Sequence, residues 1–249
     1  MRRYGPATSM TYSFGPGPMT PAVKMIIWAN VALFAASLLF RDPIIRYLGL
    51  TPGAVLERGW IWQPATYMFL HAGAMHILFN MLGIWMFGVE LERLWGTRFF
   101  ARYYAITGVG AGVTAIVAAL LPIDALHATY FVPTIGASGA LYGLLMAFAL
   151  YFPDRPILMF LLFPVPAKYF VMILGGLAFL VSPGSQVSNA AHLGGLFFGY
   201  VYLKSRQGGG GGSLTAELKY RYLKWKMNRL RRKFDVYSGG RSDWDKHVH

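Results

Sequence analysis

The sequence is 249 residues long, with 55% hydrophobic residues and only 13% charged residues. Soluble domains carry about 25% charged residues, so this composition leaves too few charges to cover a water-facing surface. The high apolar content excludes a disordered chain, and the absence of cysteine excludes disulfides and thiolate sites. The net charge of +13 indicates either nucleic-acid binding or basic residues set apart from the apolar part.

Residues 1–21 are rich in Gly, Pro, Ser and Thr, so we expect a flexible segment without the pattern of a signal peptide. Long uncharged stretches follow, and they predict an all-α polytopic membrane protein with its core at residues 22–205. A turn signal at 182–185 divides the longest stretch into two. The six predicted transmembrane helices are 22–40, 74–92, 100–121, 136–152, 167–181 and 188–205. The apolar stretch 157–165 is too short to span, and we expect it at the membrane interface.

Six spans place both termini on one side of the membrane, and the basic residues predict which side. If the termini are cytoplasmic, 20 of the 23 Lys and Arg residues lie inside, and only Arg41, Arg46 and Arg58 lie outside. Because cytoplasmic loops carry an excess of Lys and Arg, this orientation is the expected one.

The C-terminal part holds much of the positive charge. A Gly-rich linker is predicted at 206–213, and a basic tail follows at 214–249. In the tail, apolar residues from Ala216 to Phe234 recur at spacings of four and three, which predicts an amphipathic helix. The helix is either solvated or bound to anionic lipid, and nucleic acid is the less favoured partner because the tail is tethered beside a membrane.

Two polar residues inside predicted spans point to chemistry. Ser138 lies near the start of the fourth predicted span and His192 near the start of the sixth, and both predicted spans enter from the same side. These side chains therefore lie at similar depth and can meet, although they are far apart in sequence. A serine hydroxyl needs an adjacent base to become a nucleophile, and imidazole is the usual base.

Further groups at this depth fit acyl transfer. His76 and Asn80 share one face of the second span, and together with free N–H groups at the start of the fourth span they can stabilise an oxyanion. Tyr142 lies one turn after Ser138 and is the best candidate to stack on His192. Because no carboxylate falls at this depth, the sequence predicts a Ser–His dyad rather than a triad.

The same residues allow a purely structural interpretation. Pairs of small residues four apart let membrane helices pack closely, and Ser138 is then only one more small interface residue. The glycines of these pairs are Gly139 with Gly143 and Gly195 with Gly199.

Two other functions fit the sequence less well. A metal site formed by His71, His76 and His192 lacks a carboxylate and leaves the Gly-x-Ser-Gly pattern around Ser138 unexplained. A small transporter would carry paired intramembrane charges or inverted repeats, and the sequence shows neither. We therefore predict no metal and no cofactor.

Residues 22–205 resemble the rhomboid family of intramembrane serine proteases in the order, spacing and topology of their motifs. Four motifs carry the resemblance: His71 with His76–Asn80, Gly136–Gly139 with Tyr142, Ala191–Gly199, and Glu92 with Gly96. One departure is Trp62-Gln63, where many members carry Trp-Arg, so the first outer loop lacks an arginine fork.

The resemblance implies a role for each matching residue. Ser138 would be the nucleophile and His192 the general base and then acid, while His76, Asn80 and the Ser138 N–H would form the oxyanion hole. Tyr142 would stack on His192. The residues implied to support the dyad or the fold are Gly136, Gly139, Gly195, Gly199, His71, Glu92 and Gly96.

The resemblance also implies an activity and a location. Family members cleave transmembrane helices of other proteins near small or helix-breaking residues, and the fifth span, 168–181, with the loop 182–188 would control substrate access. The six-span form resembles bacterial members, which implies the inner (cytoplasmic) membrane with the active site toward its outer side. A catalytically silent rhomboid-like protein that binds client helices is the alternative, although such members lack the serine or the histidine and this chain keeps both.

Overall fold

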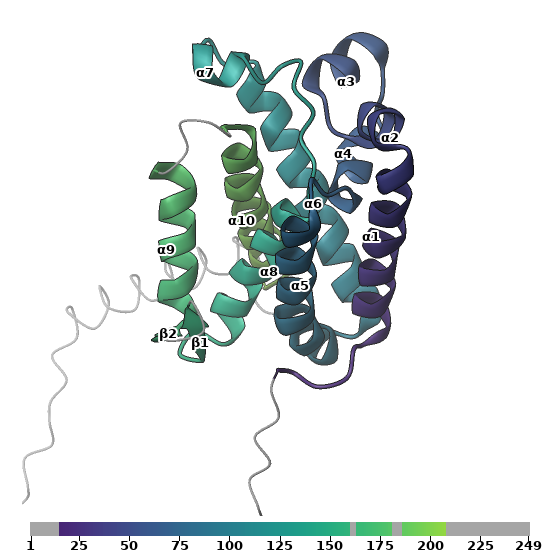
Figure 1. Cartoon of the computed structure of the whole chain (residues 1–249). Helices are drawn as coiled ribbons and strands as arrows, with labels where there is room; N and C mark the ends of the chain where they lie inside the picture. Colours follow the sequence, from purple (N-terminus) through teal and green to yellow (C-terminus); the bar gives the residue numbers. More distant parts are fainter. Residues whose placement is uncertain (1–14, 160–162, 181–185, 208–249) are drawn as a thin grey trace, which may run out of the picture. The chain divides into compact units, whose positions relative to one another are not determined.

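The computed structural model describes residues 15–159, 163–180 and 186–207, which are almost entirely helical (Figure 1). In chain order the elements are α1 (Pro21–Leu39), α2 (Arg41–Leu48), α3 (Pro52–Arg58), α4 (Gln63–Thr66), the 3-10 helix η1 (Tyr67–Phe69), α5 (Ala74–Trp95), α6 (Thr97–Ala119), α7 (Asp124–His127), α8 (Ser138–Tyr151), β1 (Pro156–Met159), β2 (Phe163–Pro166), α9 (Ala167–Leu180) and α10 (Gln186–Gln207). Helices occupy all six ranges predicted as spans, with ends that differ by a few residues.

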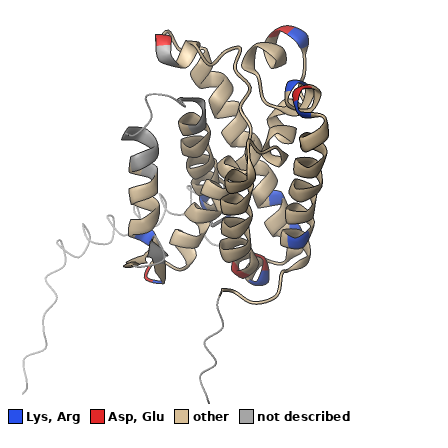
Figure 2. Ribbon diagram, in the orientation of Figure 1, with Lys and Arg blue, Asp and Glu red and all other residues tan. Residues whose placement is uncertain are grey.

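Three helices of the described residues, α1, α5 and α6, are long and apolar enough to cross a membrane, and α8 is a shorter apolar helix. Most Lys, Arg, Asp and Glu residues of the described chain lie toward the ends of the helices (Figure 2). This distribution is the one a bilayer requires, because a charge is costly in hydrocarbon. The number of six crossings stays a prediction.

Glu92 joins the ends of three helices. It lies near the end of α5, and its side chain is buried although it carries a carboxylate. It accepts hydrogen bonds from Thr20 Oγ1 at 2.5 Å, Ala22 N at 2.9 Å, Val23 N at 2.9 Å and Thr97 Oγ1 at 2.7 Å. The two N–H groups belong to the first turn of α1, where a helix has unpaired donors and favours negative charge. Gly96, at φ +78°, then turns the chain from α5 into α6 with a backbone angle that favours glycine.

Part of the N-terminal segment that was expected to be flexible is attached to α5. Within the described residues 15–20, the Arg93 guanidinium donates to the carbonyls of Pro16 at 2.5 Å and Pro18 at 3.1 Å. The indole of Trp85 donates to Gly17 O at 3.1 Å. Three carbonyls of this Pro- and Gly-rich segment are thus bound by two side chains of α5, and the flexibility of residues 1–21 stays a prediction.

Gln63 anchors the loop between α1 and α5, and it follows Trp62 at the position where the family resemblance implies an arginine. Its side chain is fully buried, and its Oε1 accepts a bond from Thr51 N at 3.0 Å. Its Nε2 donates to the carbonyls of Arg46 at 3.2 Å and Tyr47 at 3.4 Å. The neutral amide therefore pairs with backbone donors as well as acceptors, which a guanidinium cannot do because it has no acceptor.

The described residues of the apolar stretch 157–165 lie in two paired strands, β1 and β2, and its place at the membrane interface stays a prediction. Strands β1 and β2 pair antiparallel, with Pro156 opposite Pro166 and Met159 opposite Phe163. Because the sheet has only two strands, each strand has a free edge where proline is tolerated. Next to the hairpin, Lys168 pairs with Asp154 at 2.7 Å, and Arg155 pairs with Glu90 of α5. The strands were not predicted from the sequence because proline disfavours most strand positions.

Glycines bring α8 against α6 and α10. A methyl group added at these positions would overlap Ala111 for Gly139, Thr107 for Gly143, the carbonyl oxygen of Gly139 for Gly195, and the Tyr103 hydroxyl for Gly199. The packing function expected for both glycine pairs is therefore visible in the structure. It does not compete with a chemical function, because close approach of the backbones also decides which side chains meet.

The last described helix runs past the predicted end of the core. α10 continues to Gln207, which lies two residues inside the range predicted as the linker. The rest of 206–213 and the basic tail 214–249 lie outside the described residues.

Candidate active site

Ser138 is the first residue of α8, and the loop before it is fixed to the loop between α1 and α5. Thr134 and Leu50 exchange two backbone hydrogen bonds, at 2.8 and 2.9 Å, and Gly136 N donates to Tyr67 O at 3.0 Å. These bonds hold the chain in place two residues before the serine. The hydroxyl is half-buried and is accessible from a cavity.

His192 of α10 lies beside this serine. Its Nε2 is 2.8 Å from Ser138 Oγ, across 54 residues of sequence. This is a hydrogen-bonding distance between a hydroxyl and an imidazole, and it is the arrangement in which the ring can take the hydroxyl proton. The two side chains are therefore in direct contact, and their depth in the membrane stays a prediction.

Tyr142 stacks on one face of the His192 imidazole. The rings of Tyr142 and His192 are 4.2 Å apart between centroids and inclined by only 9°, so they are stacked. Tyr142 follows Ser138 by one turn of α8, so one helix presents both partners of the histidine. Stacking restricts the rotation of the ring and keeps Nε2 directed at the hydroxyl.

His76 of α5 lines the same cavity as Ser138 and His192. Its Nδ1 accepts a bond from Ala72 N at 3.3 Å, so in a neutral ring the proton is on Nε2. A methyl group at Gly136 would be 2.9 Å from His76 Nε2 and 3.6 Å from Ser138 Oγ. Gly136 has a φ of +132°, which other residues rarely adopt, so glycine meets both the backbone and the space requirement. His76 can therefore donate toward the space next to the serine.

Asn80 is buried one turn further along α5, and part of its donor capacity is used. Its Nδ2 donates to the carbonyl of His76 at 2.8 Å, which leaves one N–H of the amide available. At the start of α8, the first backbone bond from the loop is Leu141 N to Ala137 O at 3.0 Å. The N–H groups of the first residues of a helix, beginning here at Ser138, have no partner inside the helix.

These groups surround one cavity of about 400 Å³. Its walls come from α5, the loop before α8, α8 itself and α10. The lining residues are Met75, His76, Phe79, Asn80, Ile135, Ser138, Leu141, Tyr142 and His192. Five of these nine residues were predicted from the sequence, and the apolar four were not. Met75 and Phe79 share the face of α5 that carries His76 and Asn80, and this spacing was the signal that could have found them.

His71 lies next to the site but does not line the cavity. It is buried, and its ring meets the ring of His76 edge-on at 4.9 Å. Neither of its ring nitrogens has a hydrogen-bond partner among the described residues. The three histidines considered as a metal site do not form a candidate metal cluster in the described part of the chain.

Comparison with known proteins identifies the family. Residues 58–205 match the Rhomboid domain, which is more than half of the chain and includes all the residues of the cavity. The chain belongs to the rhomboid family. Together with its apolar helices, this membership makes the rhomboid described here an integral membrane protein.

This rhomboid is similar in sequence to named proteins from bacteria and yeast. YdcA of Bacillus subtilis, provisionally named a rhomboid protease, is 33% identical over 185 residues, which cover 72% of this chain and 82% of YdcA. Rhomboid protease GlpG of Haemophilus influenzae is 29% identical over 185 residues, covering 72% of this chain and 88% of GlpG. The mitochondrial Rhomboid protein 1 of Saccharomyces cerevisiae is 33% identical over 138 residues, 54% of this chain but only 38% of the yeast protein.

Proposed function

We propose that this rhomboid is an intramembrane serine endopeptidase, with Ser138 as the nucleophile and His192 as the general base. The observation that carries the proposal is the 2.8 Å distance between His192 Nε2 and Ser138 Oγ, inside a cavity of a membrane protein. The names of the relatives, which include rhomboid proteases from two bacteria, support the reaction class.

The proposed reaction has two halves. In the first, Ser138 Oγ attacks the substrate carbonyl while His192 Nε2 accepts the hydroxyl proton, and the ring then gives this proton to the leaving amine. In the second, water attacks the acyl-enzyme, and His192 accepts the proton of the water and returns it to Ser138. A single base serves both halves, so its orientation matters throughout, and the stack on Tyr142 maintains that orientation.

The negative oxygen of each tetrahedral intermediate needs donors. We assign this role to His76 Nε2, to the free N–H of the Asn80 amide and to the backbone N–H of Ser138, as the family resemblance implies. The position of His76 Nε2 beside Gly136, and its protonation through the bond from Ala72 N, support the assignment. One such donor is worth roughly 10² to 10³ in rate.

The length of α8 supports a recessed reaction site with access to water. Its 14 residues span roughly 21 Å, less than the ~30 Å of a bilayer core. Charged residues, Asp154 and Arg155, follow its far end closely and belong at the membrane surface. Ser138 then lies roughly 10 Å below the opposite surface, and the cavity connects it to the water that hydrolysis consumes.

We propose transmembrane helices of other proteins as the substrates. A helical peptide bond is shielded by its own backbone, so the substrate has to unwind before Ser138 can reach a carbonyl. Exposed apolar side chains of α5, Met75 and Phe79, flank the cavity on the side that faces lipid in this proposal. As the resemblance implies, movement of α9 would control access, together with the loop after it, most of which lies outside the described residues.

The remaining proposals concern placement in the membrane. Residues 22–205 form the six-span core, both termini are cytoplasmic, and Ser138 lies toward the outer side of a bacterial inner membrane. The tail, 214–249, binds anionic lipid on the cytoplasmic side. The distribution of basic residues supports this orientation.

The test is cleavage of a transmembrane substrate by the purified protein in detergent. We expect the wild type to release fragments and Ser138→Ala to release none, with an unchanged unfolding temperature. Thr107→Ser serves as a control, because Thr107 Oγ1 is bonded within α6 and does not line the cavity. Cleavage that persists in Ser138→Ala would contradict the proposal. Binding of the substrate without cleavage by the wild type would favour the silent alternative instead.

A further inference from the structure

A second cavity lies in the loop between α1 and α5, away from the serine and histidine. Its volume is about 420 Å³, and it is formed by α2, α3 and the loop that leads to α8. The lining residues are Asp42, Ile45, Arg46, Thr51, Gly53, Ala54, Glu57, Arg58, Trp60, Phe131 and Pro133. It shares no residue with the cavity at Ser138.

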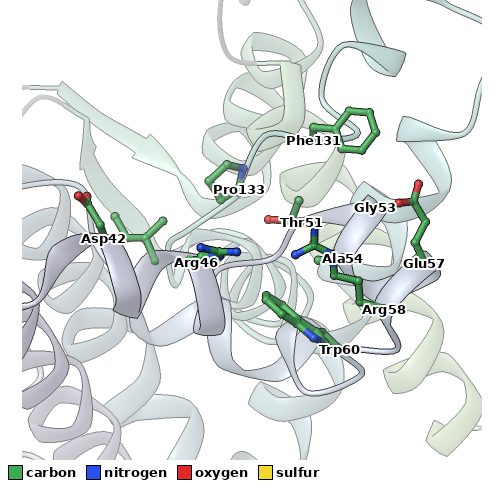
Figure 3. A pocket seen from close by; sticks show the side chains of 11 residues that line it. Asp42, Arg46, Thr51, Gly53, Ala54, Glu57, Arg58, Trp60, Phe131 and Pro133 are labelled. Carbon is green, nitrogen blue, oxygen red and sulfur yellow. The ribbon is translucent and has the colours of Figure 1, made fainter.

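Two guanidinium groups converge in this cavity. Arg46 extends from α2 and Arg58 from the end of α3, and they point toward each other on either side of Thr51 (Figure 3). The Arg58 guanidinium lies over the ring of Trp60, 5.6 Å from the ring centroid. Two positive charges that approach each other repel, so this arrangement favours an anion between them.

The carboxylates of the cavity do not neutralise this pair. Asp42 and Glu57 lie at opposite edges of the cavity, away from its centre (Figure 3). In the described residues, ion pairs join Arg155 to Glu90 and Lys168 to Asp154, and none joins the four charged residues of this cavity. Burial raises the pKa of Tyr130, and the neighbouring Glu57 carboxylate raises it further, so Glu57 interacts with Tyr130. Both arginine forks are therefore available to a ligand.

Aromatic residues around the cavity indicate the depth at which it lies. Tyr47, Trp60 and Trp62 form a stacked row, with ring centroids 5.2 and 5.9 Å apart. Tyr47 and Trp62 are exposed, and so is Ile61 between the two tryptophans. Exposed Trp and Tyr of membrane proteins concentrate at the level of the lipid headgroups. The nearest abundant anion at that level is the phosphodiester of a phospholipid.

We propose that Arg46, Arg58 and the Thr51 hydroxyl bind the phosphodiester of a phospholipid headgroup, in the leaflet at the Ser138 end of the molecule. Guanidinium forks suit phosphate because two N–H groups can bond two of its oxygens at once. The acyl chains then follow the exposed apolar side chains next to the cavity into the membrane. The bound lipid contacts both the α1–α5 loop and, through Phe131 and Pro133, the loop that leads to Ser138.

The test uses the full chain, purified in a maltoside detergent that has no phosphate. Phosphatidylglycerol with a photoreactive headgroup is added and crosslinked, and the modified peptides are identified by mass spectrometry. We expect adducts within residues 42–62, and we expect Arg46→Gln and Arg58→Gln each to weaken this labelling by about ten-fold, the value of one charge-assisted bond. Arg41→Gln is the matched control, because Arg41 lies in the same loop but outside the cavity.

Two competitors distinguish a lipid from a soluble phosphate. Excess phosphatidylglycerol should abolish the labelling of 42–62, whereas diacylglycerol, which lacks the phosphate, should not. Glycerol 1-phosphate should compete only at concentrations at least ten-fold higher. Equal competition by glycerol 1-phosphate, or by diacylglycerol, would overturn the proposal, as would labelling of 42–62 that is unchanged in both arginine variants.

A variant that fails to fold does not block the test. Arg46→Lys and Arg58→Lys keep the charge and remove only the fork, so they should fold and label several-fold less than the wild type. Labelling at the wild-type level in both would contradict the proposed fork. Because the readout is labelling, the outcome is independent of whether Ser138 is a protease nucleophile.

Discussion

Gly195 of α10 lies directly against the carbonyl oxygen of Gly139 in α8, so that no side chain larger than hydrogen fits between the two backbones. Gly139 follows Ser138, and Gly195 lies three residues after His192. The contact therefore sets the separation of the two helices at the level of the proposed dyad. Close packing and chemistry, which compete as interpretations of the sequence, depend on each other in the structure.

The variant Gly195→Ala should move His192 away from Ser138. The added methyl group overlaps the Gly139 carbonyl, so α10 has to shift, and overpacking of this kind costs about 1–3 kcal/mol of stability. We expect cleavage activity to fall by more than ten-fold while the protein still folds. The measurement is the rate of substrate cleavage, together with the unfolding temperature.

Gly176→Ala in α9 is the matched control. Among the described residues, no atom lies within 4 Å of a methyl group at Gly176, and alanine favours a helix more than glycine does. Gly176→Ala should therefore keep the activity and the stability of the wild type. An equal loss in both variants would show that helix glycines, rather than the contact with Gly139, determine the activity.

The stack on His192 predicts different effects for two substitutions of Tyr142. Tyr142→Phe keeps the ring over the imidazole and should retain most of the activity, whereas Tyr142→Leu should reduce kcat by roughly 3- to 10-fold, because an aromatic pair contributes about 0.5–1.5 kcal/mol. Since a positioning residue acts on the reaction rather than on binding, KM should change little. A loss of activity in Tyr142→Phe as large as in Tyr142→Leu would indicate that the hydroxyl matters instead of the stack.

Glu92→Gln should destabilise the fold without touching the site. The carboxylate accepts four hydrogen bonds, and an amide nitrogen in place of one oxygen cannot accept the bonds made there. We expect a loss of about 2–4 kcal/mol, measured by thermal or denaturant unfolding in detergent. Glu90→Gln is the control two residues away, because Glu90 is partly exposed and its pair with Arg155 should contribute at most about 1 kcal/mol. Equal losses in the two variants would disprove the capping role.

Gln63→Leu should loosen the loop that carries the second cavity. Leucine has a similar size but leaves Thr51 N and the carbonyl of Arg46 without their buried partner, which costs about 1–3 kcal/mol. Limited proteolysis should cut within residues 42–62 faster than in the wild type. If the cleavage pattern does not change, Gln63 is not the anchor of this loop.

Much of the site could be predicted because membrane topology restricts where polar residues can meet. Ser138 and His192 lie near the starts of predicted spans that enter from the same side, so the predicted topology implies that they lie close together. The place of Tyr142 beside His192 could be predicted because Tyr142 lies one helical turn after Ser138. The resemblance identified Glu92 as structural, but its bonds to α1 and α6 depend on where three helices end, which no local pattern in the sequence gives.

Other features depend on pairings between distant segments. The hairpin of β1 and β2 is hidden by its prolines, which favour loops in a local reading, although a two-stranded sheet tolerates them at its edges. The substitution of arginine by Gln63 suggested a weaker loop, yet the amide forms three backbone bonds that only the folded loop brings within reach. The convergence of Arg46 and Arg58 likewise depends on where the folded loop places α2 and α3, which carry them (Figure 3).

The most direct test of the central claim is covalent labelling of the intact chain with a fluorophosphonate, followed by peptide mapping. Ser138 is activated only if His192 accepts its proton, so we expect one adduct, on Ser138, and its loss in His192→Ala. Tyr142→Phe should still be labelled. An adduct on another serine, or labelling of Ser138 that is undiminished in His192→Ala, would contradict the proposed pair.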